Sequence, residues 1–196
     1  MNELLERLGI SPEIQAFFGL STELIFNYGD DVEEFGEGLH RVPTTQNLWV
    51  AGAEQADHII ITYSAMEAVA FLCFNRHRYP NLGQLAFIAI GNKLQPEQVT
   101  WIRQTYPGAN FTMVFGRQMI DQITAIKLAA GIKKFPVQVY YENNRVIILH
   151  HNVQRVFDAE RLSLHAFQET FGLRPRFRTG KPIQALTFLD QLKNNL

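Results

Sequence analysis

The apolar positions of this chain form short runs, and the pattern of these runs changes at residue 59. From there, apolar runs rich in β-branched and aromatic residues alternate with segments of helical character. The strands predicted in this part are 59–62, 85–90 and 111–115, and the helices are 64–76, 96–106 and 119–130. Continuous apolar strands between helices are typical of a mainly parallel sheet covered on both faces. The pattern therefore predicts an α/β fold with a Rossmann-like sheet flanked by helices.

The segments on either side of this core have weaker patterns. Before it, we expect helices within 2–20, short strands at 24–26 and 48–50, and an acidic loop at 29–38. After it, we expect a hairpin at 137–149 with an Asn143-Asn144 turn, a helix at 160–171, an irregular basic stretch at 174–181 and a helix at 182–192. The chain thus divides into an N-terminal α+β extension (1–57), an α/β core (58–155) and a C-terminal helical segment (156–196).

Composition describes an ordinary globular protein. The chain has 196 residues, of which 46% are hydrophobic and 19% charged, and a chain of this length buries enough surface to fold without disulfides. The single cysteine, Cys73, excludes a disulfide framework and lies in an apolar run that predicts burial. No signal peptide and no apolar run approaching the ~20 residues of a membrane span is present. We therefore expect a cytoplasmic protein with no membrane association.

The charges are distributed unevenly although the formal net charge is only −1. Residues 1–57 contain eleven acidic and two basic residues, and residues 58–196 contain eight acidic and sixteen basic residues. Such asymmetry is typical of a nucleic-acid-binding surface beside an acidic arm. The favoured interpretation, however, is that the two oppositely charged segments pack against each other.

The strongest binding signal is the segment 171–181. It contains Arg174, Arg176, Arg178 and Lys181, no acidic residue, and Phe177 between the arginines. Arginines pair with phosphates and aromatic rings stack on bases, so these five residues are candidates for binding DNA or RNA. The alternatives are a solvated basic loop, or a loop that pairs with the acidic N-terminal segment.

The segment 59–68, a strand that runs directly into a helix, is the kind of junction where open α/β sheets bind ligands. It resembles the first motif of the Toprim (topoisomerase–primase) domain. The runs 86–91 and 111–115 resemble the next two strands of that domain. The resemblance covers about residues 59–140. It implies a Toprim-like fold, similar to the primase-like Toprim proteins of bacterial mobile elements and phages.

The acidic residues of the Toprim family are missing at the matching positions. Tyr63 stands where the family has a glutamate, and Gly116, Arg117 and Gln118 stand where it has an aspartate–any–aspartate motif. The family's acids bind magnesium, which prefers carboxylate oxygens. The resemblance therefore implies a degenerate active site, with no catalytic residue carried over, no metal site and no cofactor.

Two nearby carboxylates could replace the missing acids. Glu67 lies one turn into the predicted helix, but its spacing from Ser64 favours a capping box, in which the serine caps the helix and the glutamate reaches back to it. Asp121 lies about a turn past the third strand, and a solvated helix surface is the favoured interpretation. His150 and His151 are adjacent, so in a strand they face opposite sides and do not readily share one metal.

These patterns favour a non-catalytic Toprim-like protein that binds nucleic acid or a replication or mobilisation partner. A rival is a small-molecule-binding or anion-binding α/β protein, or an enzyme, that uses polar residues at the strand ends. A structural protein–protein module is a third possibility, and the oligomeric state stays open. The candidate ligand-binding cleft consists of Tyr63, Ser64, Gly91, Asn92, Gly116, Arg117 and Gln118.

Overall fold

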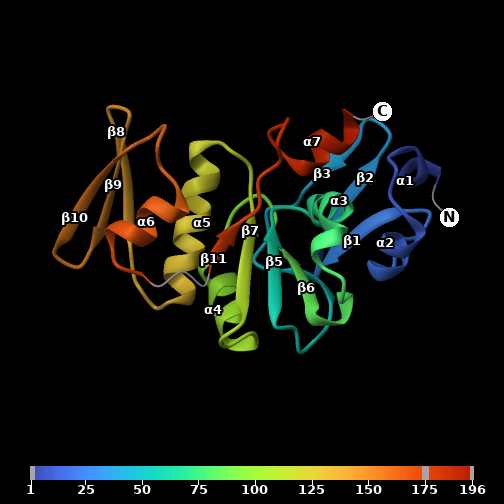
Figure 1. The fold of residues 1–196 in the computed structure, drawn as a ribbon, viewed down its shortest axis with the longest axis horizontal. Coiled ribbons are helices and arrows are strands. Elements are labelled where there is room, and N and C mark those ends of the chain that lie inside the picture. The colour runs from blue at the N-terminus through green and yellow to red at the C-terminus, as the bar shows by residue number, and fades with distance from the viewer. Residues whose placement is uncertain (1–2, 174–176, 195–196) are drawn as a thin grey trace.

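The structure is a computed structural model that describes residues 3–173 and 177–194. Its centre is a five-stranded sheet with the order β11-β7-β5-β6-β4 (Figure 1). The strands are β4 (Trp49–Gly52), β5 (His58–Thr62), β6 (Leu85–Ala89), β7 (Asn110–Val114) and β11 (Phe177–Thr179). All pairings are parallel except that of β4 with β6. The predicted α/β fold with a mostly parallel sheet is therefore confirmed.

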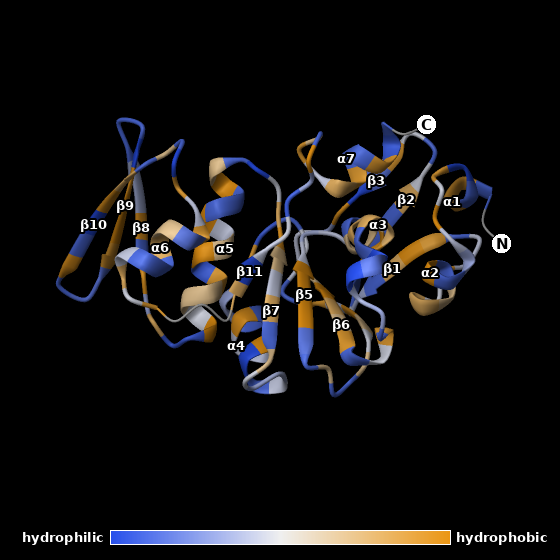
Figure 2. Cartoon of the chain, in the orientation of Figure 1, coloured by the Kyte–Doolittle hydropathy of each residue, from blue (hydrophilic) through white to orange (hydrophobic). Residues whose placement is uncertain are grey.

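Helices cover both faces of this sheet (Figure 1). One face packs against α1 (Glu3–Arg7), α2 (Pro12–Phe17), α3 (Ala65–Asn75) and α7 (Phe188–Lys193), and the other against α4 (Pro96–Thr105) and α5 (Met119–Ile132). Two 3-10 helices, η1 (Arg76–Arg78) and η2 (Leu82–Gln84), join α3 to β6. Because both faces are covered, β5 and β6 are apolar along most of their length (Figure 2).

The N-terminal part adds a second sheet of three antiparallel strands. These are β1 (Leu24–Tyr28), β2 (Asp31–Gly36) and β3 (Leu39–Arg41). The prediction of a loop at 29–38 was wrong, because most of this segment forms β2, which pairs with β1 in a tight hairpin. The predicted strands at 24–26 and 48–50 are confirmed as parts of β1 and β4.

A third sheet lies at the other end of the molecule (Figure 1). It contains β8 (Gln138–Glu142), β9 (Arg145–His150) and β10 (Val153–Asp158), with β9 in the middle. Asn143 and Asn144 join β8 to β9 with φ values of 50° and 59°, so the predicted asparagine turn is confirmed. The boundary proposed at residues 155/156 falls inside β10.

The C-terminal elements differ from the prediction in three places. Helix α6 (Leu164–Thr170) begins later than the expected residue 160, because Ser163 caps its first turn. Part of the stretch expected to be irregular forms strand β11. The last helix, α7, begins only at Phe188, where Thr187 is its N-cap. No helix within the described residues is both long and apolar enough to cross a membrane.

Candidate functional site

The carboxyl ends of β5, β6 and β7 meet at one edge of the central sheet, where the sequence placed a ligand-binding cleft. At the end of β5, Ser64 caps helix α3 by accepting the N–H of Glu67 at 3.0 Å. Glu33 of β2 reaches the same helix start. Its fully buried carboxylate accepts the N–H groups of Ala65 at 2.7 Å and Met66 at 3.0 Å. The anion-binding position at the start of α3 is thus filled by a side chain of the protein itself.

The Glu33 carboxylate has two further partners. The hydroxyl of Tyr28 donates to it at 2.7 Å, and Nε2 of His40 lies 3.1 Å from its other oxygen. Burial and the neighbouring Glu33 charge raise the pKa of Tyr28, which therefore stays a neutral donor. This network ties the N-terminal sheet to the core at the junction that the sequence singled out.

The end of β6 is closed by residues 42–47. Gly91 has a φ of 76°, and a Cβ atom there would lie 2.6 Å from the carbonyl oxygen of Pro43. Asn92 donates its backbone N–H to Pro43 at 2.8 Å and its side-chain amide to the carbonyl of Val42 at 2.6 Å. Both residues are therefore occupied in holding this segment against the strand end.

At the end of β7, the structure corrects the interpretation of Asp121 as a solvated residue. Asp121 is buried, and its carboxylate accepts the backbone N–H of Gln118 at 2.8 Å, which caps helix α5. Burial raises the pKa of this carboxyl. Gly116 is also buried, and a Cβ atom there would lie 2.4 Å from Oδ2 of Asp121. Arg117 is exposed and donates to the backbone carbonyl of Pro182.

Tyr63 lies half-buried between the ends of β5 and β7. Its hydroxyl donates to Oγ1 of Thr124 at 2.9 Å, and its ring packs against Phe115 with 4.6 Å between the centroids. Burial raises the pKa of Tyr63, so its hydroxyl is neutral at physiological pH. This strand therefore ends in a neutral side chain that packs against the end of the next strand.

The capping box predicted for Glu67 is only half correct. Ser64 caps the helix, but the Glu67 carboxylate does not reach back to it. Instead it accepts the N–H groups of Phe188 at 2.7 Å and Leu189 at 2.8 Å, and so holds the start of α7 against α3. Burial raises the pKa of Glu67 from its ordinary value of 4.5 to about 7, and the two backbone N–H bonds oppose that rise.

This raised pKa predicts a pH dependence of stability. A carboxyl that holds its proton more tightly in the folded state stabilises the protein fully below pH 4.5, and the contribution is lost as the pH rises through about 7. We expect the unfolding free energy of the wild type to lose on the order of 3 kcal/mol over this range relative to Glu67→Gln. Urea denaturation of both proteins at several pH values measures the difference. Parallel pH profiles would contradict this expectation.

The basic C-terminal segment lies along the open side of β7, as strand β11. Phe177 is buried and stacks on Phe111, with ring centroids 5.5 Å apart. Its predicted role in stacking on a base was therefore wrong, because the ring belongs to the hydrophobic core. Arg174 and Arg176 lie outside the described residues. Arg178 and Lys181 are exposed.

Other basic side chains gather around the same strand, and we call this group the β11 basic surface. It consists of Arg78, Arg117, Lys133, Lys134, Arg178 and Lys181. Arg78 and Arg178 both lie close enough to Tyr79 for their charges to lower its pKa, which burial raises. Burial and the nearby Arg117 lower the pKa of Lys181, whereas Asp121 raises it.

Direct ion pairs are few at this surface among the described residues, although Asp121 lies near Lys181 and Glu160 lines the same cleft. Within residues 3–173 and 177–194, no ion pair includes Arg78, Arg117, Lys134, Arg178 or Lys181. The N-terminal acids form their ion pairs elsewhere: Glu37 with Arg7, Glu34 with Arg41 and Glu13 with Arg76. The alternative in which the described basic residues of segment 171–181 pair with the N-terminal acids is therefore wrong.

Arg117 and Lys181 also line a polar cleft of about 380 Å³ beside the third sheet, together with Gln122, Tyr141 and Glu160. Seven residues were predicted to form a ligand-binding cleft, and Arg117 is the one of them that lines this polar cleft. The other six make contacts within the protein or lie at the start of α5. Across the described part of the chain, no three histidine, cysteine, aspartate or glutamate side chains are grouped to hold a metal ion.

Comparisons with known proteins add no relatives, since no family model, no curated protein and no solved structure matches this chain.

Proposed function

We propose that this protein binds nucleic acid, without catalysis, through the β11 basic surface. The observation that carries the proposal is the gathering of basic side chains from four separate segments around one edge strand, with no ion pair at five of them among the described residues. A polyanion of regularly spaced phosphates matches such a surface, because each phosphate contact releases condensed counterions.

The hydrogen bonds of these side chains support this use. Arg117 donates to a backbone carbonyl, and Nζ of Lys181 donates to Oε1 of Gln122 at 3.2 Å. Bonds to neutral oxygens hold the two side chains in place without neutralising them. Burial and the like charge of Arg117 lower the pKa of Lys181, although Asp121 opposes this shift, and an incoming phosphate would offset the like charge.

The non-catalytic part of the proposal rests on the carboxylates near the strand ends. Glu33, Glu67 and Asp121 each accept a backbone N–H at the start of a helix. Their oxygens thus serve the fold, as expected of a degenerate Toprim-like protein in which other residues replaced the metal-binding acids. Magnesium-dependent cleavage of DNA, or primer synthesis, by the purified protein would contradict this part.

The expected result is a steep salt dependence of binding. Fluorescence anisotropy with labelled single-stranded and duplex DNA measures affinity over a range of NaCl concentrations. The logarithm of the affinity should fall with the logarithm of salt by about 0.7 to 0.9 per phosphate contacted. The double variant Arg178→Gln/Lys181→Gln should reduce this slope by about 2.

The matched control is Lys93→Gln/Arg155→Gln, which removes two basic residues outside the β11 basic surface. Its slope and affinity should equal those of the wild type. A flat salt response, no binding at low salt, or equal losses in both double variants would refute the proposal.

A further inference from the structure

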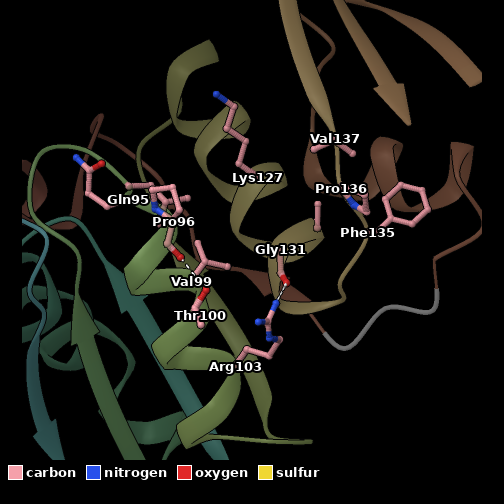
Figure 3. Close-up of a pocket in the computed structure, with 12 residues that line it drawn as sticks. Gln95, Pro96, Val99, Thr100, Arg103, Lys127, Gly131, Phe135, Pro136 and Val137 are labelled. Carbon is pink, nitrogen blue, oxygen red and sulfur yellow. Dashed lines mark hydrogen bonds between the residues drawn. The ribbon is translucent and has the colours of Figure 1, made fainter. Parts of the chain in front are cut away.

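A second feature of the molecule is a cleft of about 430 Å³ between α4 and α5 (Figure 3). Helix α4 contributes one wall, including Val99 and Arg103, and the second half of α5 contributes the opposite wall, including Lys127 and Gly131. The segment 135–137 forms the third side. The cleft shares no residue with the β11 basic surface, so the inference below does not rest on the proposed function.

The walls of the cleft are fixed by contacts within the fold. A Cβ atom at Gly131 would lie 2.4 Å from Cγ1 of Val99, so the two helices meet at this glycine. The third wall is fixed from behind, because the ring of Phe135 stacks on His150 with centroids 3.4 Å apart. Nδ1 of His150 also lies 2.7 Å from the carbonyl oxygen of Pro136. A ligand would therefore meet preformed walls and lose little affinity to ordering them.

The charges in the cleft are all positive. Its lining contains Arg103 and Lys127 but no aspartate or glutamate, and neither basic residue forms an ion pair within the described chain. Nη1 of Arg103 donates to the carbonyl of Gly131 at 3.2 Å, which holds the guanidinium at the floor between the helices (Figure 3). Lys127 is exposed and stands on the α5 side (Figure 3).

The rest of the lining is mainly apolar. Leu94, Val99, Ala130, Pro136 and Val137 are among its apolar residues, and Gln95 and Thr100 are its uncharged polar ones. A concave, largely apolar site with a few fixed polar groups is typical of small-molecule binding. We infer that this cleft binds a small molecule that carries an anionic group, a phosphate or a carboxylate, on a flat apolar body. The anion contacts Arg103, beside Gly131, and the charge of Lys127, whose amine lies toward the other end of the cleft, adds to the attraction (Figure 3). The apolar body packs on the helices and on segment 135–137.

Three matched probes test this inference. 1-Naphthyl phosphate, 1-naphthoate and neutral 1-naphthol share one ring system, and saturation-transfer NMR with titration measures the affinity of each. At least one of the two anions should bind about tenfold more tightly than 1-naphthol, which corresponds to about 1.4 kcal/mol. The tighter of the two anions identifies the preferred group. Equal binding of all three probes, or no binding of either anion, would overturn the inference.

Variants locate the site. Lys127→Gln changes an exposed side chain. It should lower the affinity for the more tightly bound anion about threefold or more, while leaving the affinity for 1-naphthol unchanged. Arg103→Gln should also lower the affinity for this anion and leave the affinity for 1-naphthol unchanged. Val137→Trp should lower the affinity for all three probes, because the larger side chain fills the cleft. Arg155→Gln, on β10, is the control and should change none of the affinities. Anion binding that is unaffected by Lys127→Gln, Arg103→Gln and Val137→Trp in folded proteins would place it elsewhere and contradict the inference.

Discussion

Replacing Glu33 with alanine is expected to lower the free energy of unfolding by about 3–5 kcal/mol. The carboxylate is fully buried and accepts the N–H groups of Ala65 and Met66 and the hydroxyl of Tyr28. Alanine would leave these buried donors without an acceptor, and each such loss costs about 1–3 kcal/mol. Urea denaturation of the wild type and the variant measures the change.

The neighbouring residue Glu34 provides the control. It lies on the same strand, but it faces outward and its ion pair with Arg41 is 3.6 Å long and partly exposed. Glu34→Ala should therefore change stability by no more than about 0.5 kcal/mol. Similar losses in the two variants would show that Glu33 does not anchor the start of α3.

The second large effect is expected for Glu67→Ala. A glutamate in a simple capping box would cost about 1 kcal/mol on replacement, but this buried carboxylate bonds two backbone N–H groups of another helix. We expect a loss of about 2–4 kcal/mol. We also expect the amides of Phe188 and Leu189 to exchange with solvent much faster than in the wild type. Hydrogen exchange followed by NMR measures this local change.

Glu169→Ala is the matched control for Glu67→Ala, because Glu169 is an exposed helical residue whose carboxylate lies 3.5 Å from Nε2 of the exposed His165. It should leave both the stability and the exchange of the α7 amides unchanged. Unaltered exchange at Phe188 and Leu189 in Glu67→Ala would contradict the role of Glu67 in holding α7.

The central sheet could be predicted from sequence because its strands are buried on both faces. Such strands are continuous apolar runs, and 59–62 and 85–90 have no polar interruption apart from Thr62. The turn at Asn143 and Asn144, which joins β8 to β9 in the third sheet, is also a local signal. Each of these features depends on residues close together in the chain.

The contacts that close the strand ends were not predictable in the same way. Glu67 meets residues 121 and 122 positions further along the chain, and Glu33 meets Ala65 across 32 positions. The acidic composition of 29–38 suggested a loop, although Glu33 and Phe35 alternate with exposed or half-buried residues as inward positions of a strand do. That alternation was the available signal for Glu33.

Strand β11 illustrates a different limit. It has three residues, and only pairing with β7 makes it a strand. The charge pattern of 171–181 identified the binding candidates Arg178 and Lys181. It could not show that Arg78, Arg117 and Lys134 approach the same strand from distant parts of the chain.

The carboxyl ends of β5 and β6 are closed by contacts within the protein, and we propose that nucleic acid binds instead around β11. A titration of ¹⁵N-labelled protein with a short single-stranded oligonucleotide at low salt, followed by two-dimensional NMR, tests it most directly. We predict that the largest shifts occur at Arg178, Lys181 and Arg117, and that Ser64, Gly91 and Asn92 change little. The largest shifts at Ser64, Gly91 and Asn92, or no shifts at any residue, would contradict the claim.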